Sequence, residues 1–585
     1  MTDPAFLGVE CSLSDRRWLG PGAETIRHAE AISQSSALPD ALSRILAARG
    51  VPPEDVQNYL DPRLRDLLPN PMSLKDMGVA ADRLITALEA KQKIAIFADY
   101  DVDGGASAAL LLDWLRQQDH NATLYVPDRI DEGYGPNPEA MSELANSHDL
   151  IVCVDCGTLS FDAIAAARNA DVVILDHHLG GETLPDAIAV VNPNRQDETG
   201  DLSHLCAAAV VFLTLVETNK RLRDRGRTGP DLMSMLDLVA LATVADVAPL
   251  IGVNRALVRQ GLKIMATRQR VGLAALADVA GLDAPPSAYH LGYVLGPRVN
   301  AGGRIGRADL GARCLSATDK DEALSLAERL DQLNRERREI ENAVRDAALA
   351  QAEARGLEAP LVWAAGEGWH PGVVGIVASR LKAATGRPSV VIGLDGGEGK
   401  GSGRSIAGID LGHSVQKLAA EGLLIKGGGH RMAAGLTVAR DQLDAAMDRL
   451  STLMEVQGAG EGEARDLHID AALMPVAATP ELVTQIDAAG PFGQSAPAPR
   501  FAFPDVRIYF AKEVGSGHLK LTFGAENTRI DAIAFNALET PMGQALMQHN
   551  GARFHLAGHL EINHWGGRQR VQLSLQDAAP AELRS

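Results

Sequence analysis

The sequence predicts an α/β protein with a parallel sheet, a long connecting helix, a second α/β unit and a small C-terminal β-barrel. Between residues 90 and 195, apolar β-branched runs alternate with helical patterns, as they do in parallel sheets covered by helices. The stretch 319–356 is heavily charged but carries one apolar stripe at helical spacing. Beyond residue 463, strand-like alternation returns between turn signals, which is typical of a barrel.

The bulk composition narrows the class of protein. A chain of 585 residues is too long for one hydrophobic core, so we expect three or more domains. No run of about 18 apolar residues occurs and the start lacks a basic-then-apolar signal, so we expect no membrane segment and a cytoplasmic protein. Five cysteines, including Cys153 and Cys156, form neither a disulfide framework nor a four-ligand zinc pattern, which fits a reducing compartment.

The formal net charge of −19 argues against indiscriminate binding of nucleic acid, which depends on lysine and arginine displacing counterions from phosphates. Any site for a polyanion must therefore be local. The stretch from Arg298 to Arg313 holds four arginines and one acid, Asp309, and is a local basic island of this kind.

The predicted parallel sheet follows an N-terminal helical segment, residues 1–75, in which Leu42–Gly50 is patterned as a short amphipathic helix. The domain built on the sheet is expected to span 76–318. Its five strand-like runs are Ile94–Asp99, Thr123–Pro127, Leu150–Asp155, Asp171–Asp176 and Ala187–Asn192. In such sheets, ligands gather at the carboxyl ends of the strands. We therefore expect Asp99, Asp155 and Asp176, which end three of the runs, to meet at that edge.

Further acidic residues follow the first of these strands. Asp99, Asp101 and Asp103 occupy alternate positions, and alternate residues of an extended chain share a face. Three carboxylates on one face repel each other, so a fold that keeps them together is expected to do so around cations. Carboxylate oxygens suit Mg²⁺ or Mn²⁺. The alternative for an isolated Asp-x-Asp is an acidic surface turn.

Two histidines and a distant aspartate extend this prediction. His177 and His178 follow Asp176 at the end of the fourth run, and neutral imidazole is a good ligand for Mn²⁺. Asp246 ends the apolar helical pattern Leu236–Ala245, where a carboxylate is unfavourably placed against the helix dipole unless a cation is near. The alternatives are hydrogen-bonded structural histidines and an exposed carboxylate at a helix end.

These motifs carry a resemblance to a known family. The segments Asp99–Gly104, Val154–Gly157, Asp176–His178 and Ala245–Val247 resemble, in this order, four motifs of the DHH phosphoesterase superfamily. Pro127–Gly135 and Gly296–Arg304 resemble segments of its RecJ-type single-stranded-DNA exonucleases, and the resemblance runs from about residue 42 to 577. It implies a DHH domain, a DHH-associated (DHHA1) α/β domain at 357–456 and an oligonucleotide-binding (OB) barrel at 463–578.

The same resemblance implies a phosphodiesterase that uses two Mn²⁺ or Mg²⁺ ions. Asp155 would bridge the ions, and Asp99 and Asp101 would bind mainly one of them. The ligands of the other ion would be Asp103, His177 and Asp246. Two such ions can activate a water molecule and neutralise a phosphate under attack. His178 would lie near the scissile phosphate as electrophilic support or as the acid for the leaving group, and Asp176 would orient the histidines.

Candidate phosphate-binding residues lie in both α/β domains. The second domain, with strand-like Leu361–Ala365 and Ser389–Leu394, contains glycine-rich segments whose backbone amides can approach a phosphate. By resemblance, Ser402 and Arg404, with Arg129 opposite, are candidates for a 5′-phosphate pocket. Further candidate contacts to DNA are Arg298, Asn300, Arg304, Gly428, Gly429 and His430.

The charged stretch 319–356 is expected to form a strut helix between the two α/β domains. Its apolar stripe consists of Leu326, Leu330, Leu333, Ile340, Val344 and Ala347. The alternative is a coiled-coil dimer, but Arg337 interrupts the seam, so we expect a monomer.

A glycine-rich linker, Gly458–Gly462, precedes the predicted barrel. The strand candidates of the barrel are Phe501–Phe510, His518–Phe523, Arg529–Phe535, Arg553–Ile562 and Arg570–Leu575. Aromatic and basic residues mixed along such a surface suit stacking on single-stranded DNA. The candidates for this role are Tyr509, Lys512, Lys520, His564, Trp565 and Arg568. The alternative is a β-sandwich whose aromatic residues form the core.

The function implied by the resemblance is a metal-dependent exonuclease that degrades single-stranded DNA from its 5′ end, in repair and recombination. One alternative is an enzyme that cuts very short RNA or cyclic dinucleotides, but such relatives resemble the two α/β units alone. The other is a non-catalytic replication scaffold, although every expected ligand position here holds an acid or a histidine. Single-strand-binding protein and a RecQ-type helicase are expected partners by the same resemblance.

Overall fold

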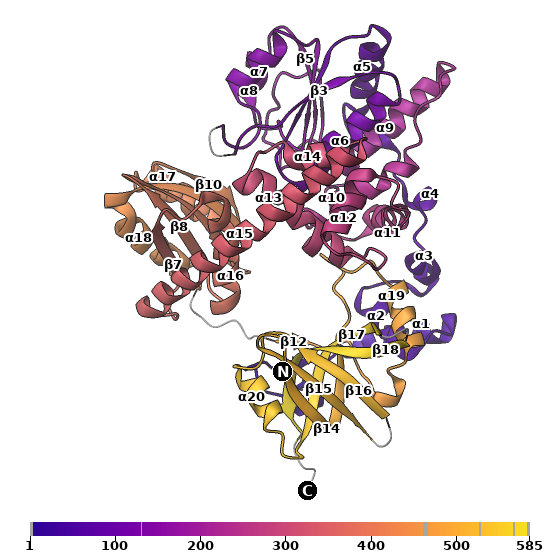
Figure 1. Ribbon diagram of the computed structural model, residues 1–585, viewed down its shortest axis with the longest axis vertical. Helices are drawn as coiled ribbons and strands as arrows, with labels where there is room; N and C mark the ends of the chain where they lie inside the picture. Colours follow the sequence, from indigo (N-terminus) through magenta and orange to yellow (C-terminus); the bar gives the residue numbers. More distant parts are fainter. Residues whose placement is uncertain (1–3, 130–131, 460–465, 526–527, 566–567, 582–585) are drawn as a thin grey trace. The chain divides into compact units, whose positions relative to one another are not determined.

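The structure is a computed structural model that describes residues 4–129, 132–459, 466–525, 528–565 and 568–581 (Figure 1). Its elements fall into two compact units. The two-sheet unit comprises Pro69–Ala248 and Gln260–Glu463, and the barrel unit comprises Met1–Leu68, Pro249–Arg259 and Ala464–Ser585. All the predicted metal ligands belong to the two-sheet unit.

A five-stranded parallel sheet forms the first half of the two-sheet unit, as predicted. Its strands are β2 (Ile94–Ala98), β3 (Ala122–Tyr125), β4 (Leu150–Val154), β5 (Asp171–Leu175) and β6 (Ala189–Val191). All residues of β2 and β4 are buried, since both faces of a parallel sheet are covered, and this burial explains their continuous apolar sequence. The spatial order is β3-β2-β4-β5-β6, so the chain runs from β2 to β3 on one side and then to β4 on the other. Open parallel sheets bind ligands outside such a switch point.

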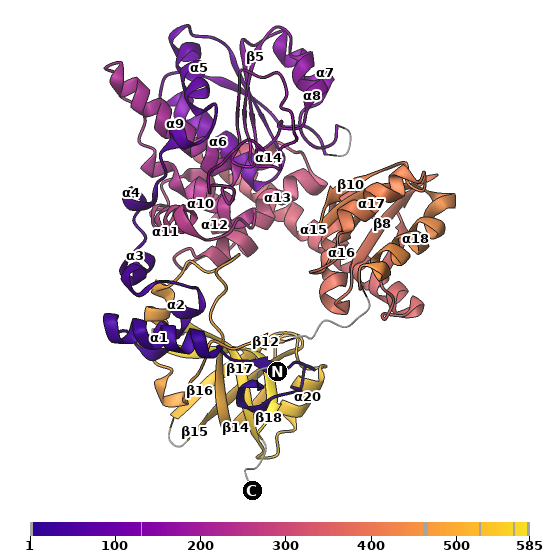
Figure 2. The same ribbon diagram turned by 180° about the vertical axis from the view of Figure 1, so that it is seen from behind.

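Helices cover both faces of this sheet (Figures 1 and 2). On one face, α7 (Pro138–Ala145) and α8 (Phe161–Ala166) share a hydrophobic core with side chains of β2, β4 and β5. The other face is covered by α5 (Met77–Glu89), α6 (Val102–Arg116) and α9 (Ala207–Asp224). Burial of apolar side chains between these layers fixes the strand ends, where the predicted site lies.

An all-helical region follows the parallel sheet along the chain. Its helices are α10 (Leu236–Ala245), α11 (Gly252–Ala266), α12 (Val271–Val279), η5 (His290–Leu295), α13 (Gly296–Ile305) and α14 (Leu310–Ser316), with short 3-10 helices η3 (Pro71–Ser73) and η4 (Met233–Met235) nearby in the fold. The element η5 is a π-helix, which the sequence pattern does not predict. It continues directly into α13, and residues 288–305 are called the η5–α13 run below.

The predicted strut is the helix α15 (Lys320–Arg355). The buried members of its apolar stripe are Leu326, Leu330, Leu333 and Val344. They pack inside the unit, where α15 contacts α12, α13, α14 and α16 (Pro371–Thr385), so the coiled-coil alternative is wrong for this stripe. Ala347 is exposed and Ala348 is buried in its place, because the helical repeat after Val344 continues by four residues.

A second five-stranded sheet forms the other half of the two-sheet unit. Its strands are β7 (Val362–Glu367), β8 (Ser389–Asp395), β9 (Glu398–Arg404), β10 (Lys426–His430) and β11 (Ala433–Ala439). The spatial order is β10-β11-β9-β8-β7, and β7 and β8 pair in parallel whereas the other neighbours are antiparallel. The helix α16 packs on one face, and α17 (Leu411–Ala420) and α18 (Leu443–Val456), which follows the short 3-10 helix η6 (Arg440–Gln442), pack on the other.

The glycine-rich segments of this second sheet are strands, which the sequence does not predict, because glycine has a low β-propensity. The glycines that alternate along β9 are Gly399, Gly401 and Gly403. A Cβ on each of them would lie only 2.7–2.8 Å from a side-chain atom of Ile392 or Leu411, so close packing requires glycine at these positions. Ser402 and Arg404 consequently point to the opposite face, which α16 covers.

The barrel unit contains a closed five-stranded barrel, as predicted. Its strands are β14 (Phe501–Val514), β15 (His518–Ala525), β16 (Thr528–Ala534), β17 (Arg553–Trp565) and β18 (Arg568–Pro580). Pairing of β14 with β17 closes the barrel, which excludes the β-sandwich alternative. The accessory elements are β12 (Leu467–His468), β13 (Ala471–Ala472), η7 (Pro475–Ala477), α19 (Pro480–Ala488) and α20 (Pro541–Met547).

The N-terminal segment belongs to the barrel unit. Its elements are η1 (Phe6–Gly8), β1 (Trp18–Leu19), α1 (Ala23–Ser36), α2 (Asp40–Ala48), η2 (Pro53–Asp55), α3 (Val56–Leu60) and α4 (Leu64–Leu67). Ile32 and Ile45 share one core with Phe501 of the barrel. The buried Trp18 Nε1 donates to the buried Asp577 carboxylate at 2.9 Å. The two ends of the chain therefore fold together, which local sequence patterns cannot show.

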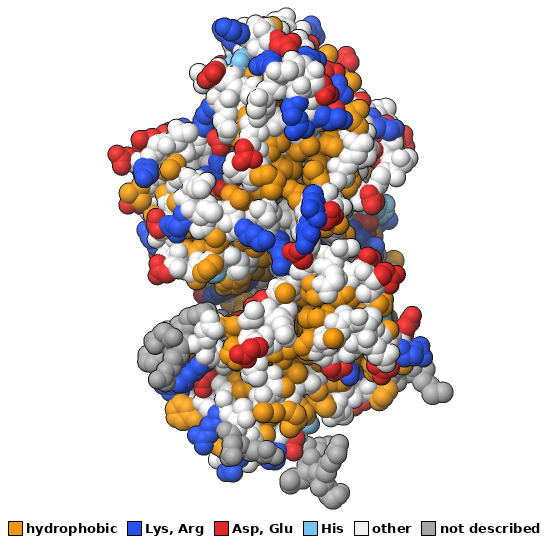
Figure 3. Space-filling model, turned by 90° about the vertical axis from the view of Figure 1, so that its right-hand side faces the viewer, with side chains coloured by type: hydrophobic (Ala, Val, Ile, Leu, Met, Phe, Trp, Pro, Cys, Tyr) orange, Lys and Arg blue, Asp and Glu red, His pale blue; other side chains and the backbone are white. Residues whose placement is uncertain are grey.

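The surface mixes charges of both signs. On the face shown in Figure 3, Lys and Arg side chains are interspersed with Asp and Glu side chains. The acidic excess of the sequence is therefore not gathered on that face. Among the described residues, no helix combines the length and the apolar character needed to cross a membrane.

Candidate metal centre and phosphate pocket

The carboxyl edge of the parallel sheet gathers the predicted acidic residues. Asp99, Asp155 and Asp176 directly follow β2, β4 and β5, and each is at most 3% exposed. Since β2 and β4 flank the switch point, Asp99 and Asp155 border the same space. Asp155 has a left-handed backbone with φ of 61°, which costs most residues about 1–2 kcal/mol but which aspartate visits more readily.

Two groups of side chains have the spacing of metal ligands, and a third group, Asp155, His177 and His178, shares one residue with each of them. The first group is Asp99, Asp101 and Asp155, the second is Asp103, His177 and Asp246, and the ligand atoms within each group lie within 4.8 Å of one another. His177 Nε2 connects the groups, since it lies 3.2 Å from Asp155 Oδ1 and 3.6 Å from Asp103 Oδ2. The same nitrogen is 3.7 Å from Asp246 Oδ2. The structure thus brings together all six residues predicted as metal ligands.

The electrostatics of this cluster favour bound cations. Burial raises the pKa of Asp99 and of Asp155 well above the usual range, and neighbouring carboxylates raise both further. Burial, with Asp103 and Asp101, raises the pKa of Asp246 to about 8. Among the described residues, one buried oxygen each of Asp99 and Asp155 lacks a hydrogen-bond partner, and leaving such an atom unsatisfied is costly. Oxygen ligands with one imidazole suit Mn²⁺ or Mg²⁺, so the residues fit the predicted ions.

Helix N-termini hold two of these carboxylates in place. Asp101 caps α6, because its Oδ1 accepts from the backbone N–H groups of Asp103 at 2.8 Å and Gly104 at 3.1 Å. Asp103 in turn accepts from the N–H groups of Ala207 at 2.6 Å and Ala208 at 2.8 Å, at the start of α9. The positive end of each helix dipole stabilises the carboxylate. Both ligands are therefore fixed before any cation binds.

His178 belongs to the third of these ligand groups and is oriented by two partners. Its Nδ1 is 2.8 Å from Asp176 Oδ1, and its Nε2 is 2.9 Å from the Tyr134 hydroxyl. Burial lowers the pKa of His178, but the hydrogen bond with Asp176, together with the negative charges of Asp176, Asp246 and Asp99, outweighs burial and raises the pKa to about 9. Burial alone would raise the pKa of Asp176, yet the hydrogen bonds from His178 and Thr158 hold it below the usual range. An ionised Asp176 therefore orients the histidine.

Four residues around the histidines are not predicted by the sequence: Tyr134, Thr158, Asn192 and Asn194. Thr158 Oγ1 donates to Asp176 Oδ2 at 2.7 Å, and Asn192 Nδ2 donates to the His178 carbonyl at 2.8 Å. Asn194 Nδ2 donates to the His177 carbonyl at 2.6 Å. A signal existed for Asn192, which ends the fifth strand-like run at the same sheet edge. Tyr134 stands within a quoted motif, but nothing local in the sequence connects it with His178.

Three of the predicted phosphate contacts form a cluster of arginines. The Arg129 guanidinium lies 5.3 Å from the centre of the Tyr100 ring. Burial, followed by repulsion from Arg129, lowers the pKa of Arg304 to about 10 and also lowers that of Arg404. Arg304 Nη1 donates to the Gly372 carbonyl at 3.2 Å, and Arg404 Nη1 donates to Ser402 Oγ at 3.0 Å. Both acceptors, a carbonyl and a hydroxyl oxygen, are uncharged. Positive charge concentrated in this way favours a bound anion.

Glycines of α16 make room for this arginine cluster. A Cβ on Gly375 would lie 3.0 Å from Ser402 Oγ and 3.1 Å from Arg404 Nη2. A Cβ on Gly372 would lie 2.4 Å from the Arg304 carbonyl. The helix therefore approaches both halves of the two-sheet unit closely and brings Arg304 of the first half near Arg404 of the second.

Other predicted contacts to DNA have structural partners or lie farther along the second sheet. Arg298 donates to Asp331 of α15 at 2.9 Å and its side chain is 12% exposed. Asn300 Oδ1 accepts from the Val102 N–H at 3.2 Å and so supports the start of α6. Gly428, Gly429 and His430 lie in β10. His430 pairs with Ala433 of β11, which pairs with Arg404, so His430 is two strands from Arg404 on the same face.

The predicted stacking residues of the barrel lie among cations. The ring of Tyr509 has the guanidinium of Arg529 at 4.7 Å and that of Arg507 at 5.9 Å from its centre. Lys512 lies 6.0 Å from the centre of the Phe510 ring. Lys520 pairs with Asp531 at 3.3 Å. The side chains of His564, Trp565 and Arg568 lie outside the described residues.

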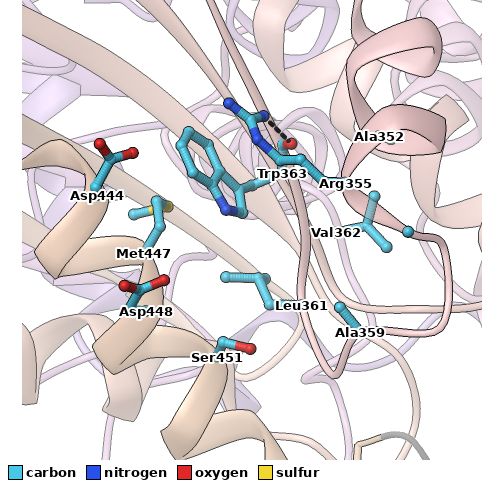
Figure 4. Close-up of a pocket in the computed structure, with 11 residues that line it drawn as sticks. Ala352, Arg355, Ala359, Leu361, Val362, Trp363, Asp444, Met447, Asp448 and Ser451 are labelled. Carbon is cyan, nitrogen blue, oxygen red and sulfur yellow. Dashed lines mark hydrogen bonds between the residues drawn. The ribbon is translucent and has the colours of Figure 1, made fainter.

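A separate cavity of about 370 Å³ lies between the end of α15, β7 and α18 (Figure 4). The Arg355 guanidinium lies 3.8 Å from the centre of the Trp363 ring, and its Nη1 donates to the Trp363 carbonyl at 2.9 Å. Asp444 and Asp448 of α18 also line the cavity. None of the predicted site residues line it.

Three segments of the chain match known protein families. Residues 93–243 match the DHH family N-terminal domain, 358–455 match the DHHA1 domain, and 469–577 match the RecJ OB domain. The chain is 38% identical over 568 residues to the single-stranded-DNA-specific exonuclease RecJ of Dickeya dadantii, covering 93% of this chain and 96% of that protein. It is 35% identical over 573 residues to the protein of the same name from Escherichia coli, with the same coverage. For the Bacillus subtilis protein of that name, identity is 33%, and the match covers 88% of this chain and 64% of that protein.

Two solved structures are similar over nearly the whole chain. The crystal structure of RecJ in complex with Mn²⁺ from Thermus thermophilus has a TM-score of 0.79 at 27% identity, and the match covers 97% of this chain and 80% of that chain. The complex with Mg²⁺ from the same organism has a TM-score of 0.74, with coverage of 97% and 79%.

Proposed function

Because the chain belongs to the RecJ family, we propose that it is a single-stranded-DNA-specific exonuclease that uses two divalent cations, in DNA repair and recombination. The observation that carries the proposal is the pair of ligand groups that meet at the switch point of the parallel sheet. The Mn²⁺ and Mg²⁺ complexes of the Thermus thermophilus relative support the same ions as cofactors. The RecJ OB domain supports a polymer substrate over a cyclic dinucleotide.

The geometry supports a division of the ligands between two cations. Asp99 and Asp101 would bind one ion, and Asp155, which groups with these two residues and also with His177, would bind both. The further ligands of the second ion would be Asp103, His177 and Asp246. When bound, two such ions lower the pKa of a water molecule and neutralise the charge of the phosphate under attack. The chain contributes carboxylates that helix N-termini have already oriented, so little reorganisation accompanies the reaction.

His178 is the group best placed for proton transfer or for hydrogen bonding to the phosphate. Its side chain is 41% exposed, and its Nδ1 is 3.9 Å from Asp155 Oδ1. Asp176 and Tyr134 fix the orientation of the ring. We assign His178 as the residue that stabilises the scissile phosphate or protonates the leaving oxygen, and Asp176 as the residue that positions it.

The arginine cluster supports recognition of a strand end. A terminal phosphate monoester carries more negative charge than an internal diester, so a pocket of several guanidinium groups favours the end of a strand. The residues proposed for this pocket are Arg129, Arg304, Ser402 and Arg404. The resemblance of Ser402 and Arg404 to RecJ-type motifs supports a 5′ phosphate, which gives 5′→3′ polarity.

Family membership also supports a cytoplasmic monomer that cooperates with single-strand-binding protein and a RecQ-type helicase. The buried stripe of α15 supports the monomer, because it leaves no coiled-coil seam along that helix. Sedimentation of the purified protein alone and with each candidate partner tests these proposals. A dimer, or no co-sedimentation with either partner, would contradict them.

Digestion of a 3′-labelled single-stranded oligonucleotide in Mn²⁺, Mg²⁺ or chelator tests the main proposal. We expect progressively shorter labelled products with either metal, no products in chelator, and suppression by a block at the 5′ end. The duplex of the same sequence and a cyclic dinucleotide are the control substrates. Binding of DNA without cleavage in either metal would instead support a non-catalytic scaffold, and preferred cleavage of the dinucleotide would support the other alternative.

A further inference from the structure

Two tyrosines with no role so far lie exposed at the start of the η5–α13 run. Tyr289 is 64% exposed and Tyr293 is 67% exposed. Their ring centres are 5.1 Å apart and their planes are inclined by 29°, so the rings stack on each other in the open. Large aromatic side chains usually gain stability from burial, so a stacked pair left on the surface is suited to a ligand that covers it.

The beginning of the run packs against the helix that carries Asp246 into the metal centre. A Cβ on Gly292 would lie 3.4 Å from Val244 Cγ1, and a Cβ on Gly296 would lie 3.2 Å from the Ala245 Cβ. These are the last residues of α10, directly before Asp246. The tyrosine pair therefore lies on the element that packs against the residues directly before Asp246.

The end of the run packs against the segment that carries Asp99, Asp101 and Asp103. Asn300 accepts from the Val102 N–H at 3.2 Å, and a Cβ on Gly303 would lie 2.8 Å from the Tyr100 carbonyl. The contact positions 292, 296, 300 and 303 follow each other by four, four and three residues, so they form one helical face. Tyr289 and Tyr293 lie at the same end of the run as Gly292 and Gly296, which contact the residues before Asp246.

We propose that Tyr289 and Tyr293 form a stacking platform for bases of the single-stranded DNA that lies at the metal centre. This inference rests on the proposed function and adds two residues that position its substrate. Every base has a π-face, so stacking on tyrosine holds a strand without selecting its sequence, as an exonuclease that advances along DNA requires. Tyr293 lies in the π-helix η5 and Tyr289 directly precedes it, and such irregularities often mark functional sites. Continuity with the metal centre favours nucleobases over a protein partner.

Three double variants test the platform. Tyr289→Ala with Tyr293→Ala removes both rings, Tyr289→Phe with Tyr293→Phe keeps them, and Tyr289→Leu with Tyr293→Leu keeps apolar bulk without a ring. We expect KM for single-stranded DNA to rise by about 5- to 150-fold in the alanine and leucine variants, the range for losing stacking on one base, and to stay near the wild-type value in the phenylalanine variant. Because both rings are exposed, all variants should unfold at the wild-type temperature.

Abasic substrates identify what the tyrosines contact. On an oligonucleotide with a run of abasic positions, the affinity of wild-type protein should fall. The affinity of the alanine variant should not fall below its value on ordinary DNA. Equal KM for wild-type protein and the alanine variant on ordinary DNA would overturn the platform and leave a protein partner as the occupant. If KM of the alanine variant remained higher than that of wild-type protein on abasic DNA, this result would also overturn the platform. Failure of wild-type protein to cleave or bind single-stranded DNA would instead overturn the proposed function itself.

Discussion

Replacing Asp155 by asparagine should stabilise the metal-free protein while abolishing its activity. The buried Asp155 carboxylate lies among Asp103, Asp101 and Asp99, and burial and these charges raise its pKa. Two charges about 4 Å apart interact by about 4 kcal/mol at an effective dielectric constant of about 20, and partial protonation relieves some of this repulsion. We therefore expect Asp155→Asn to raise the free energy of unfolding in chelator by about 1–3 kcal/mol. Asparagine also accepts the left-handed backbone at this position, so no strain is added.

In Mn²⁺, wild-type protein should be more stable than Asp155→Asn, which is the reverse of the order expected in chelator. Saturating Mn²⁺ at about 100 times its Kd stabilises a folded protein by about 2.7 kcal/mol for each site, and a variant without the shared ligand should lose most of that gain. If each ion contributes about 3 kcal/mol to transition-state stabilisation, loss of both lowers the rate by about 10⁴-fold. Thermal unfolding in chelator and in Mn²⁺, together with initial rates on single-stranded DNA, measures these effects.

Asp176→Asn is the matched control, because Asp176 is equally buried but its hydrogen bonds are satisfied. Its pKa is lowered in the folded protein, so losing the charge should destabilise the protein in chelator by about 1–3 kcal/mol. The shift of the unfolding temperature on adding Mn²⁺ should remain. A destabilised Asp155→Asn protein in chelator, or one with Mn²⁺-dependent cleavage, would refute the reasoning.

Three further substitutions test other parts of the structure. Gly104→Ala would place a Cβ 2.4 Å from the Asp99 carbonyl, so we expect loss of Mn²⁺ binding by calorimetry and a cost of about 1–3 kcal/mol in unfolding; a wild-type binding curve would contradict this. Arg404→Lys keeps the charge but not the planar fork, so the ratio of cleavage rates on 5′-phosphorylated and 5′-hydroxyl strands should fall towards one, whereas an unchanged ratio would remove Arg404 from the pocket. Trp18→Phe removes the donor to Oδ2 of the buried Asp577, whose Oδ1 still accepts from the Ala578 N–H, and should destabilise the barrel unit by about 1–3 kcal/mol in urea unfolding, with Mn²⁺ affinity unchanged.

The grouping of Asp99, Asp155 and Asp246 could be predicted because these residues each directly follow a regular element. Asp99 and Asp155 end buried apolar strands, and the rule that parallel strands place their carboxyl ends at one edge brings them together. Asp246 ends a buried helix in the same way. Two supporting residues could not be predicted: Tyr134, which contacts His178, and Thr158, which donates to Asp176. Both lie in loops whose paths depend on tertiary packing.

The fold was predictable wherever burial leaves a periodic pattern. The strands of the parallel sheet are apolar because helices cover both faces, whereas β9 is rich in glycine because Ile392 and Leu411 leave no space for a side chain. Its sequence therefore lacks the pattern of a strand. The packing of α1 and α2 on the barrel was equally invisible, since it joins the two ends of the chain. The π-helix η5 could not be predicted, because the hydrogen-bond register of the backbone changes there without a change in apolar spacing.

The proposed division of the ligands requires Asp155 to bind two cations at once. Anomalous scattering from crystals soaked in Mn²⁺ measures this directly. We expect two peaks about 3.5–4 Å apart, with the Asp155 carboxylate between them and Asp99 and Asp246 on opposite sides. A single peak, or two peaks of which only one contacts Asp155, would contradict the account.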